Sequence, residues 1–211
     1  GRSAQGQKAA ASHTGALAGS DAVYDAAIAR AGMLRVNSLQ ELFLAAETLA
    51  RFRTNRSESL TILTNGGGAG VMAADTAAQV NVPLTELGAS TLAQLDAVLP
   101  ANWSHGNPVD IIGDAPVKRY GEALQILHND PNGAAVLFIH APTAIVPSAD
   151  IATALSALPQ SATAWLMSCW LGGHGVEAAR QIFKGAGIAD YPTPEEAVRA
   201  FSMLLNFHRN Q

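Results

Sequence analysis

The sequence predicts an α/β protein built on a doubly wound parallel sheet. Beyond residue 59, short apolar segments rich in β-formers alternate with segments of helical periodicity. Residues 134–139 form a continuous apolar run, as a strand buried on both faces should. Parallel strands need right-handed crossover helices that cover both faces of the sheet, so this alternation favours a doubly wound arrangement.

The first 58 residues follow a different pattern. Residues 1–20 are rich in Gly, Ala, Ser and Gln and show no period, so we expect an ordered loop at best. Helices are predicted over 22–31 and 38–51, the second because apolar residues recur there at helical intervals. The charged segment 51–58 has little apolar periodicity and is interpreted as a linker, with a domain boundary near 52–58.

Five strands alternate with helices beyond this boundary. The predicted strands are 60–63, 82–87, 134–139, 162–167 and 187–189. The predicted helices are 71–78, 90–98, 117–128, 148–157, 175–184 and 194–207. Pro83 marks the second strand as an edge strand, because proline cannot donate in a ladder. If the strand order is the flavodoxin-like one, ligands bind between the carboxyl ends of the first and third strands.

Composition narrows the classes of function. A formal net charge of −4 argues against nucleic acid or an acidic membrane as the main partner. The single cysteine, Cys169, excludes an intramolecular disulfide and fits a reducing cytoplasm. No apolar run reaches the roughly 18 residues of a membrane span. The chain opens on Gly1 without an initiator methionine, so we expect a fragment of a longer protein.

His13 stands among small residues, in the run Ser12-His13-Thr14-Gly15-Ala16-Leu17-Ala18-Gly19-Ser20-Asp21. Such neighbours leave an imidazole open to a phosphoryl donor, and its neutral nitrogen is nucleophilic near pH 7. A lone histidine in a polar loop is more often simply solvated. The remaining histidines show no metal-ligand spacing and Cys169 has no partner cysteine, so no metal site is predicted.

A glycine-rich turn lies between an expected strand and an expected helix. Consecutive glycines allow positive φ and close backbone approach, so several N–H groups can converge on one anion at a helix N-terminus. A tight turn without a ligand is the alternative. The turn lacks the Lys-Ser or Lys-Thr of a P-loop, so a nucleoside triphosphate is not expected there. The phosphate-binding candidates are Asn65, Gly66, Gly67, Gly68, Ala69 and Gly70.

Four further residues are candidates for lining the site. Asn107 and Asp110 lie in a turn-rich stretch, where Asp110 could equally shape a turn. Gly172 and Gly173 follow the fourth predicted strand and form either a second backbone anion site or a plain turn. No Gly-x-Ser-x-Gly elbow is present, which disfavours a serine hydrolase.

Four motifs, in order, carry a family resemblance. Residues 11–21 resemble the phosphohistidine loop of the NDP-forming (ADP-forming) acyl-CoA synthetases, relatives of succinyl-CoA synthetase. Residues 64–71 are similar to the glycine loop that opens the flavodoxin-like ligase domain of that family. Residues 106–110 and 191–198 also match its pattern, so the resemblance covers essentially the whole chain.

The resemblance implies the reversible conversion of acyl-CoA, ADP and phosphate to acid, CoA and ATP, through an acyl phosphate and a phosphohistidine. His13 would be phosphorylated, and residues 65–70 would receive the phosphoryl group. Residues 1–55 would be the C-terminal half of the phosphohistidine-loop ligase domain, a partial second α/β domain. Residues 59–211 would be the flavodoxin-like ligase domain of the succinyl-CoA synthetase type.

The family also has a CoA-binding domain and an ATP-grasp domain, which this chain lacks. The resemblance thus implies missing domains or a missing subunit. It implies that the intact enzyme uses CoA, ATP or ADP, phosphate and Mg²⁺. The fragment alone would be inactive and would hold none of these cofactors. The apolar face of Leu39, Leu42, Phe43 and Leu49 would dock on the larger domain or form a homodimer. Two alternatives stay open: a synthetase-like regulatory region of a protein lysine acetyltransferase, and a plain flavodoxin-like interaction module.

Overall fold

The computed structural model describes residues 2–14, 20–52, 54, 57–133, 135–159 and 165–211, without the side chains of His13 and Thr14. Its five strands form one parallel sheet in the order β2-β1-β3-β4-β5. They are β1 Leu60–Thr64, β2 Val109–Asp110, β3 Ala135–His140, β4 Leu166–Trp170 and β5 Ala189–Asp190. This is the flavodoxin-like order, so the predicted fold class and the switch point between β1 and β3 are confirmed.

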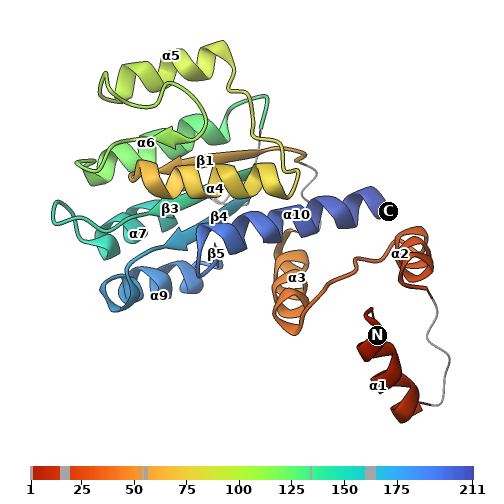
Figure 1. Ribbon diagram of the computed structural model, residues 1–211. Coiled ribbons are helices and arrows are strands. Elements are labelled where there is room, and N and C mark those ends of the chain that lie inside the picture. Colours follow the sequence, from red (N-terminus) through yellow and green to blue (C-terminus); the bar gives the residue numbers. More distant parts are fainter. Residues whose placement is uncertain (1, 15–19, 53, 55–56, 134, 160–164) are drawn as a thin grey trace.

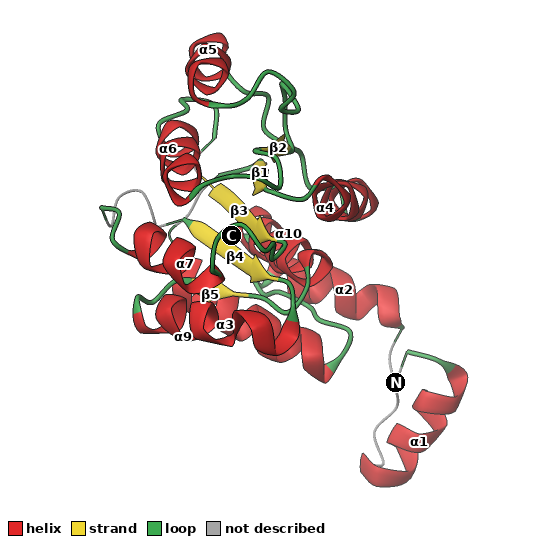
Figure 2. Ribbon diagram, turned by 90° about the vertical axis from the view of Figure 1, so that its left-hand side faces the viewer, coloured by secondary structure: helices red, strands yellow, loops and turns green. Residues whose placement is uncertain are grey.

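Helices cover both faces of the sheet. Figure 2 shows α6 and α7 on one side and α4 and α10 on the other. The helices are α1 Ala4–Thr14, α2 Asp21–Arg30, α3 Leu39–Phe52, α4 Gly67–Gln79, α5 Ala89–Val98, α6 Val117–His128, α7 Ser148–Ser156, the 3₁₀ turn η1 Gly173–Val176, α9 Glu177–Gly185 and α10 Pro194–Asn210. The described residues of these helices include none long and apolar enough to cross a bilayer.

Alternate residues of the buried strands point into two separate cores. On β3, Val136 and Phe138 pack with α6, α7 and α9, whereas Leu137 and Ile139 pack with α4 and α10. All six residues of β3 are buried, which explains the unbroken apolar run in the sequence. The sheet is therefore fixed from both sides, and its carboxyl edge is a rigid base for the loops above it.

The second strand was predicted in the wrong place. The edge strand is Val109–Asp110, inside the stretch expected to be all turns, and Leu84 forms only an isolated bridge to Leu60. Asn107 fills the edge between them: its side chain accepts a hydrogen bond from the Ile62 N–H (2.9 Å) and donates to the Leu60 carbonyl (2.9 Å). A two-residue strand supplemented by one side chain has no period that a sequence could reveal.

The fourth strand and the N-terminus also differ from expectation. β4 begins at Leu166 and ends at Trp170, later than the predicted 162–167, of which 162–164 lie outside the described residues. Residues 4–14 form the helix α1 rather than a loop. The alanines of α1 favour helix without creating an apolar stripe, so propensity rather than periodicity explains it. In Figures 1 and 2 α1 lies apart from the sheet.

Only part of the apolar face of α3, which was expected to dock or to dimerise, is buried. Phe52 is buried and Leu49 is partly buried against the core that contains α10, and Thr48 shares a buried 3.0 Å hydrogen bond with the Tyr191 hydroxyl. Leu39 and Phe43 remain 74% and 71% exposed. The C-terminal half of α3 thus packs on the core that contains α10, while its N-terminal half presents apolar side chains to solvent.

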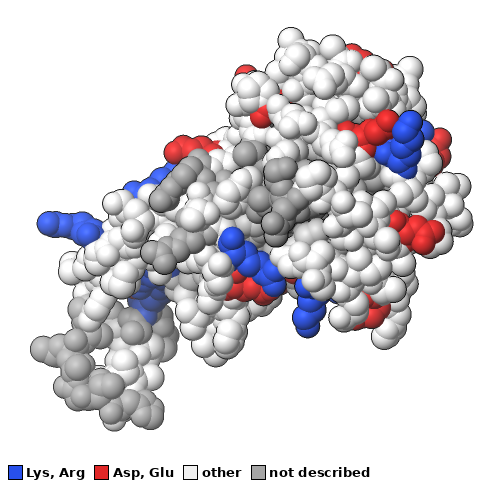
Figure 3. All heavy atoms as spheres, turned by 180° about the vertical axis from the view of Figure 1, so that it is seen from behind, with Lys and Arg blue, Asp and Glu red and all other residues white. Residues whose placement is uncertain are grey.

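Charged side chains occur in small groups of both signs on the face shown in Figure 3. Ion pairs in the fold join nearby charges, such as Arg119 with Asp114 (2.6 Å) and Lys118 with Glu122 (3.3 Å). Exposed pairs of this kind contribute little to stability. On that face the described residues form no extended basic surface.

Candidate functional site

Asn65 ties together the two strands that flank the switch point. It follows β1 directly and is 3% exposed. Its side-chain amide donates to the Ala141 carbonyl (2.8 Å), and its Oδ1 accepts from the Ala141 N–H (2.9 Å). Both polar atoms of the side chain are therefore engaged with β3's exit segment. These two bonds let the side chain position the turn.

The glycine turn opens α4 at the carboxyl edge of the sheet. Gly66 is the N-cap in an extended conformation, and α4 begins at Gly67 rather than at residue 71. The N–H groups of Ala69 and Gly70 already donate to the Gly66 carbonyl (3.0 and 3.3 Å). Those of Gly67 and Gly68 precede the helical ladder, and both residues are exposed. Backbone donors and the positive end of a helix thus face solvent at the switch point, a geometry suited to an anion.

Of the two reasons expected for these glycines, positive φ was wrong. Positive φ occurs at Gly32, Gly172, Gly173 and Gly187 among the described glycines, and not within the turn. Close approach explains the turn instead. A Cβ on Gly66 would lie 3.0 Å from that of Ala141, and one on Gly67 would lie 2.9 Å from Asp110 Oδ2. A Cβ on Gly70 would lie 3.1 Å from Thr64 Cγ2.

The structure brings Asp110 to this turn but not Asn107. Asp110 ends β2 and is aligned with Thr64 of β1, so its side chain reaches the start of α4. Asn107 instead bonds Ile62 and Leu60 and donates to the Thr85 carbonyl (3.0 Å). Its amide is used along the edge of β1, and the role of Asn107 in lining the site stays a prediction.

Gly172 and Gly173 lie beyond the carboxyl end of β4, on the same edge of the sheet. Their φ angles are 122° and 55°, and a Cβ on Gly172 would lie 2.7 Å from Pro142 Cγ. These conformations require glycine whether or not a ligand binds. The turn leads into the short η1 rather than directly into a long helix. An anion site at this turn stays a prediction.

His13 lies in the last turn of α1, and residues 15–19 of its motif lie outside the described residues. In both ribbon views α1 stands away from the sheet (Figures 1 and 2). The two motifs that suggested phosphoryl transfer are therefore not adjacent in this chain.

Two family models match the sequence. One, described as a succinyl-CoA ligase like flavodoxin domain, matches residues 1–49, and the other, described as a Ligase-CoA domain, matches residues 60–202. The chain is also 42% identical over 209 residues to acetate–CoA ligase [ADP-forming] I of Archaeoglobus fulgidus. It belongs to the ADP-forming acyl-CoA synthetase family. The resemblance based on the four motifs is confirmed.

Other relatives of this synthetase chain agree. The alpha subunit of acetate–CoA ligase [ADP-forming] I of Pyrococcus furiosus is 35% identical, over 99% of the chain and 46% of the relative. A solved structure, the dinucleotide forming acetyl-coenzyme A synthetase 1 of Ca. Korarchaeum cryptofilum in complex with phosphate and ADP, is 32% identical with a TM-score of 0.91. That match covers 100% of this chain and 46% of that one. The Archaeoglobus match covers 99% of this chain and 29% of the relative, so the chain spans less than half the length of these proteins.

His140 is a buried polar residue of the synthetase chain to which the sequence assigned no role. It ends β3 and shares a 3.0 Å hydrogen bond between its Nε2 and Ser148 Oγ. Its ring packs among Tyr120, Phe138 and Trp170, and its Nδ1 has no hydrogen-bond partner among the described residues. Burial lowers the pKa of His140 to about 4. Its position at the end of an apolar strand was the available signal, and it indicates a neutral packing residue.

The buried imidazole should make stability depend on pH. The unfolded chain takes up a proton near pH 6.5 whereas the folded chain does so near 4, so stability is complete above 6.5 and falls as pH drops towards 4. The full loss is on the order of 3 kcal/mol. We expect His140→Gln to flatten urea-unfolding free energies measured between pH 7 and 4.5. His174→Gln, at an exposed site, is the control; equal slopes in His140→Gln and wild type would contradict the assignment.

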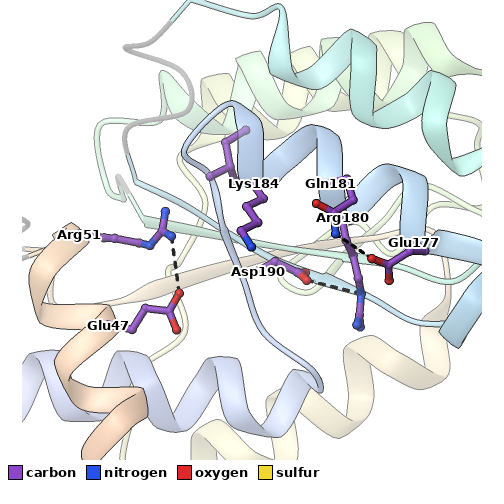
Figure 4. Close-up of a pocket in the computed structure, with 8 residues that line it drawn as sticks. Glu47, Arg51, Glu177, Arg180, Gln181, Lys184 and Asp190 are labelled. Atoms are coloured by element: carbon purple, nitrogen blue, oxygen red, sulfur yellow. Dashed lines mark hydrogen bonds and ion pairs between the residues drawn. The ribbon is translucent and has the colours of Figure 1, made fainter.

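A charged pocket of about 300 Å³ lies along the edge strand β5, between α3 and α9 (Figure 4). Arg180 lies 3.4 Å from Asp190 and donates to the Trp170 carbonyl (2.8 Å). Arg51 donates to the Gly187 carbonyl (2.8 Å) and lies 3.5 Å from Glu47. Burial raises the pKa of Asp190, and Arg180 opposes that rise. These contacts join α3 to the sheet edge.

Proposed function

We propose that this chain supplies part of the phosphoryl-transfer machinery of an ADP-forming acyl-CoA synthetase. The start of α4 carries the proposal: exposed N–H groups of Gly67 and Gly68 face the switch point of a chain from this family. The reaction is the interconversion of acyl-CoA, ADP and phosphate with acid, CoA and ATP. A phosphate oxygen attacks the thioester carbonyl and CoA leaves; an imidazole nitrogen then takes the phosphoryl group as the acid leaves, and ADP receives it.

His13 is the proposed imidazole. A neutral imidazole is nucleophilic near pH 7, and transfer depends mainly on positioning and on stabilising charge. The turn of residues 65–70 is proposed to bind the phosphoryl group. Since α1 stands apart from the sheet, His13 must meet its donors and acceptors in the assembled enzyme. We assign residues 1–55 to a partial phosphohistidine-loop domain and residues 59–211 to the flavodoxin-like ligase domain.

The proposal requires partners. CoA-binding and ATP-grasp domains, in the same protein or in a second subunit, would bring CoA and ADP or ATP, as expected for a chain that spans under half of its relatives. The described residues contain no group of three or more His, Cys, Asp or Glu fit to hold a metal ion, so we assign Mg²⁺ to those partners. A cytoplasmic location follows from the use of ADP and CoA. The exposed Leu39 and Phe43 would serve a homodimer or a partner domain.

The assay of the whole protein tests the proposal. With the remaining domains or subunit present, acetyl-CoA, ADP and phosphate should yield ATP, whereas the 211-residue chain alone should yield none. Acyl transfer to protein lysines without ATP formation would favour the acetyltransferase alternative, which the acetate–CoA ligases among the relatives do not support.

Phosphate titration of the chain tests the turn itself. We expect phosphate to shift the amide NMR signals of residues 65–70 with weak affinity, because water competes for a half-built cradle. Gly67→Val should weaken binding, since a Cβ there would lie 2.9 Å from Asp110 Oδ2 and displace the carboxylate. Gly121→Val is the matched control, because nothing lies within 4 Å of a Cβ at that helical position. Shifts confined to other residues would leave the glycines as a structural turn.

A further inference from the structure

Asp110 presents one unpaired carboxylate oxygen to the start of α4. Its Oδ1 accepts a hydrogen bond from the Ile112 N–H (2.9 Å), and its own N–H donates to Ser104 Oγ (2.9 Å). Its Oδ2 accepts no hydrogen bond from the part of the chain that the structure describes. That oxygen lies against Gly67, 2.9 Å from where a Cβ would stand.

The carboxylate is held in this direction from both sides. The pairing of Asp110 with Thr64 fixes its backbone on the sheet. Ile112 holds Oδ1 from a left-handed conformation, with a φ of 69°, which is uncommon for a β-branched residue. Rotation of the side chain away from Gly67 would break the bond to Ile112. Because Oδ2 lies against Gly67, an anion bound by the exposed Gly67 N–H group would have this oxygen as a neighbour.

The Asp110 carboxylate attracts an anion that carries an acidic proton and repels one that does not. Hydrogenphosphate keeps an acidic O–H near neutral pH and can donate it to a carboxylate, forming a short charge-assisted hydrogen bond. Sulfate has no such proton at that pH, so the same oxygen repels it. Backbone N–H groups alone do not make this distinction, because they donate to either anion.

We propose that Asp110 is a specificity-determining residue that selects hydrogenphosphate over fully deprotonated oxyanions at the start of α4. The inference rests on the proposed function, because it assumes that phosphate binds at this turn. It adds a role for Asp110: the carboxylate accepts the proton of the incoming phosphate as a hydrogen bond and so orients the anion.

Two pairs of anions test this in the 211-residue chain, followed by the amide signals of residues 66–70. Phosphate and arsenate carry an acidic proton near neutral pH, and sulfate and selenate do not. We expect the protonated pair to bind at least about tenfold more tightly, the effect of one hydrogen bond to a charged group. Asp110→Asn should remove this preference mainly by strengthening sulfate and selenate binding, while its Oδ1 still accepts from Ile112.

Asp75→Asn is the matched control, because it removes the same charge from an exposed position on α4, the helix that opens at Gly67. It should keep the preference. Equal binding of all four anions to the wild-type chain would overturn the role of Asp110 and leave the anion site standing, and so would a preference that survives in Asp110→Asn. Silence of the 66–70 amides with every anion would overturn the site and the inference together. The wild-type comparison decides the matter even if the variant folds poorly.

Discussion

Replacing His13 with alanine in the intact protein should abolish its phosphoryl adduct completely. If His13 is the nucleophile, no other group in the chain can take its place, because transfer requires a nitrogen aligned with the phosphorus. Folding should be unaffected, since α1 stands apart from the sheet and its core. Labelling with radioactive ATP, followed by acid and base treatment, provides the measurement: a phosphohistidine is lost in acid and survives base.

His128→Gln is the control for the loss of an imidazole. His128 ends α6, and helices in this fold run antiparallel to the strands, so it lies at the sheet edge opposite the glycine turn. This variant should label like the wild type. Full labelling of His13→Ala, or an adduct stable to acid, would contradict the assignment of His13.

The architecture could be predicted because burial leaves a mark on sequence. β3 is apolar throughout since both of its faces are covered, and α10 shows a capping residue, Thr193, whose hydroxyl accepts from the Glu196 N–H (3.1 Å). The sequence of β2 shows no such apolar pattern. It has two residues, and the side chain of Asn107 supplies the contacts that a longer strand would have made. Such a tertiary substitution is visible only once the elements are in place.

The site could be predicted in location but not in detail. The glycine run correctly marked a turn at the switch point. Gly66, Gly67 and Gly70 are each crowded by a neighbour from another element, such as Ala141 for Gly66, whereas nothing lies within 4 Å of a Cβ at Gly68. Asp110 reaches Gly67 because of the register between β1 and β2, and that strand was not foreseen. The helix over residues 4–14 was missed because an alanine-rich segment without a stripe gives no periodic signal.

Asn65→Ala should be the most destabilising polar substitution at the switch point. It removes both side-chain hydrogen bonds of a residue that is 3% exposed and leaves the N–H and carbonyl of the half-buried Ala141 without their partners. Each unsatisfied group costs about 1–3 kcal/mol, so we expect a loss of roughly 2–6 kcal/mol in the free energy of urea unfolding. Asn129→Ala, which removes one exposed bond to the Gln125 carbonyl, should cost less than about 1 kcal/mol.

The effect of Asn65 on anion binding separates positioning from direct contact. Its side chain is occupied by Ala141, so its removal should loosen the turn rather than delete a ligand of the anion. Asn65→Asp keeps the acceptor for the Ala141 N–H but sets a carboxylate oxygen against the Ala141 carbonyl, so its loss of stability should be at least that of Asn65→Ala. Phosphate affinity at residues 66–70 should fall with stability in Asn65→Ala and fall further in Asn65→Asp, because the added charge also repels the anion. An Asn65→Ala variant that is as stable as the wild type but blind to phosphate would show instead that the amide itself contacts the anion.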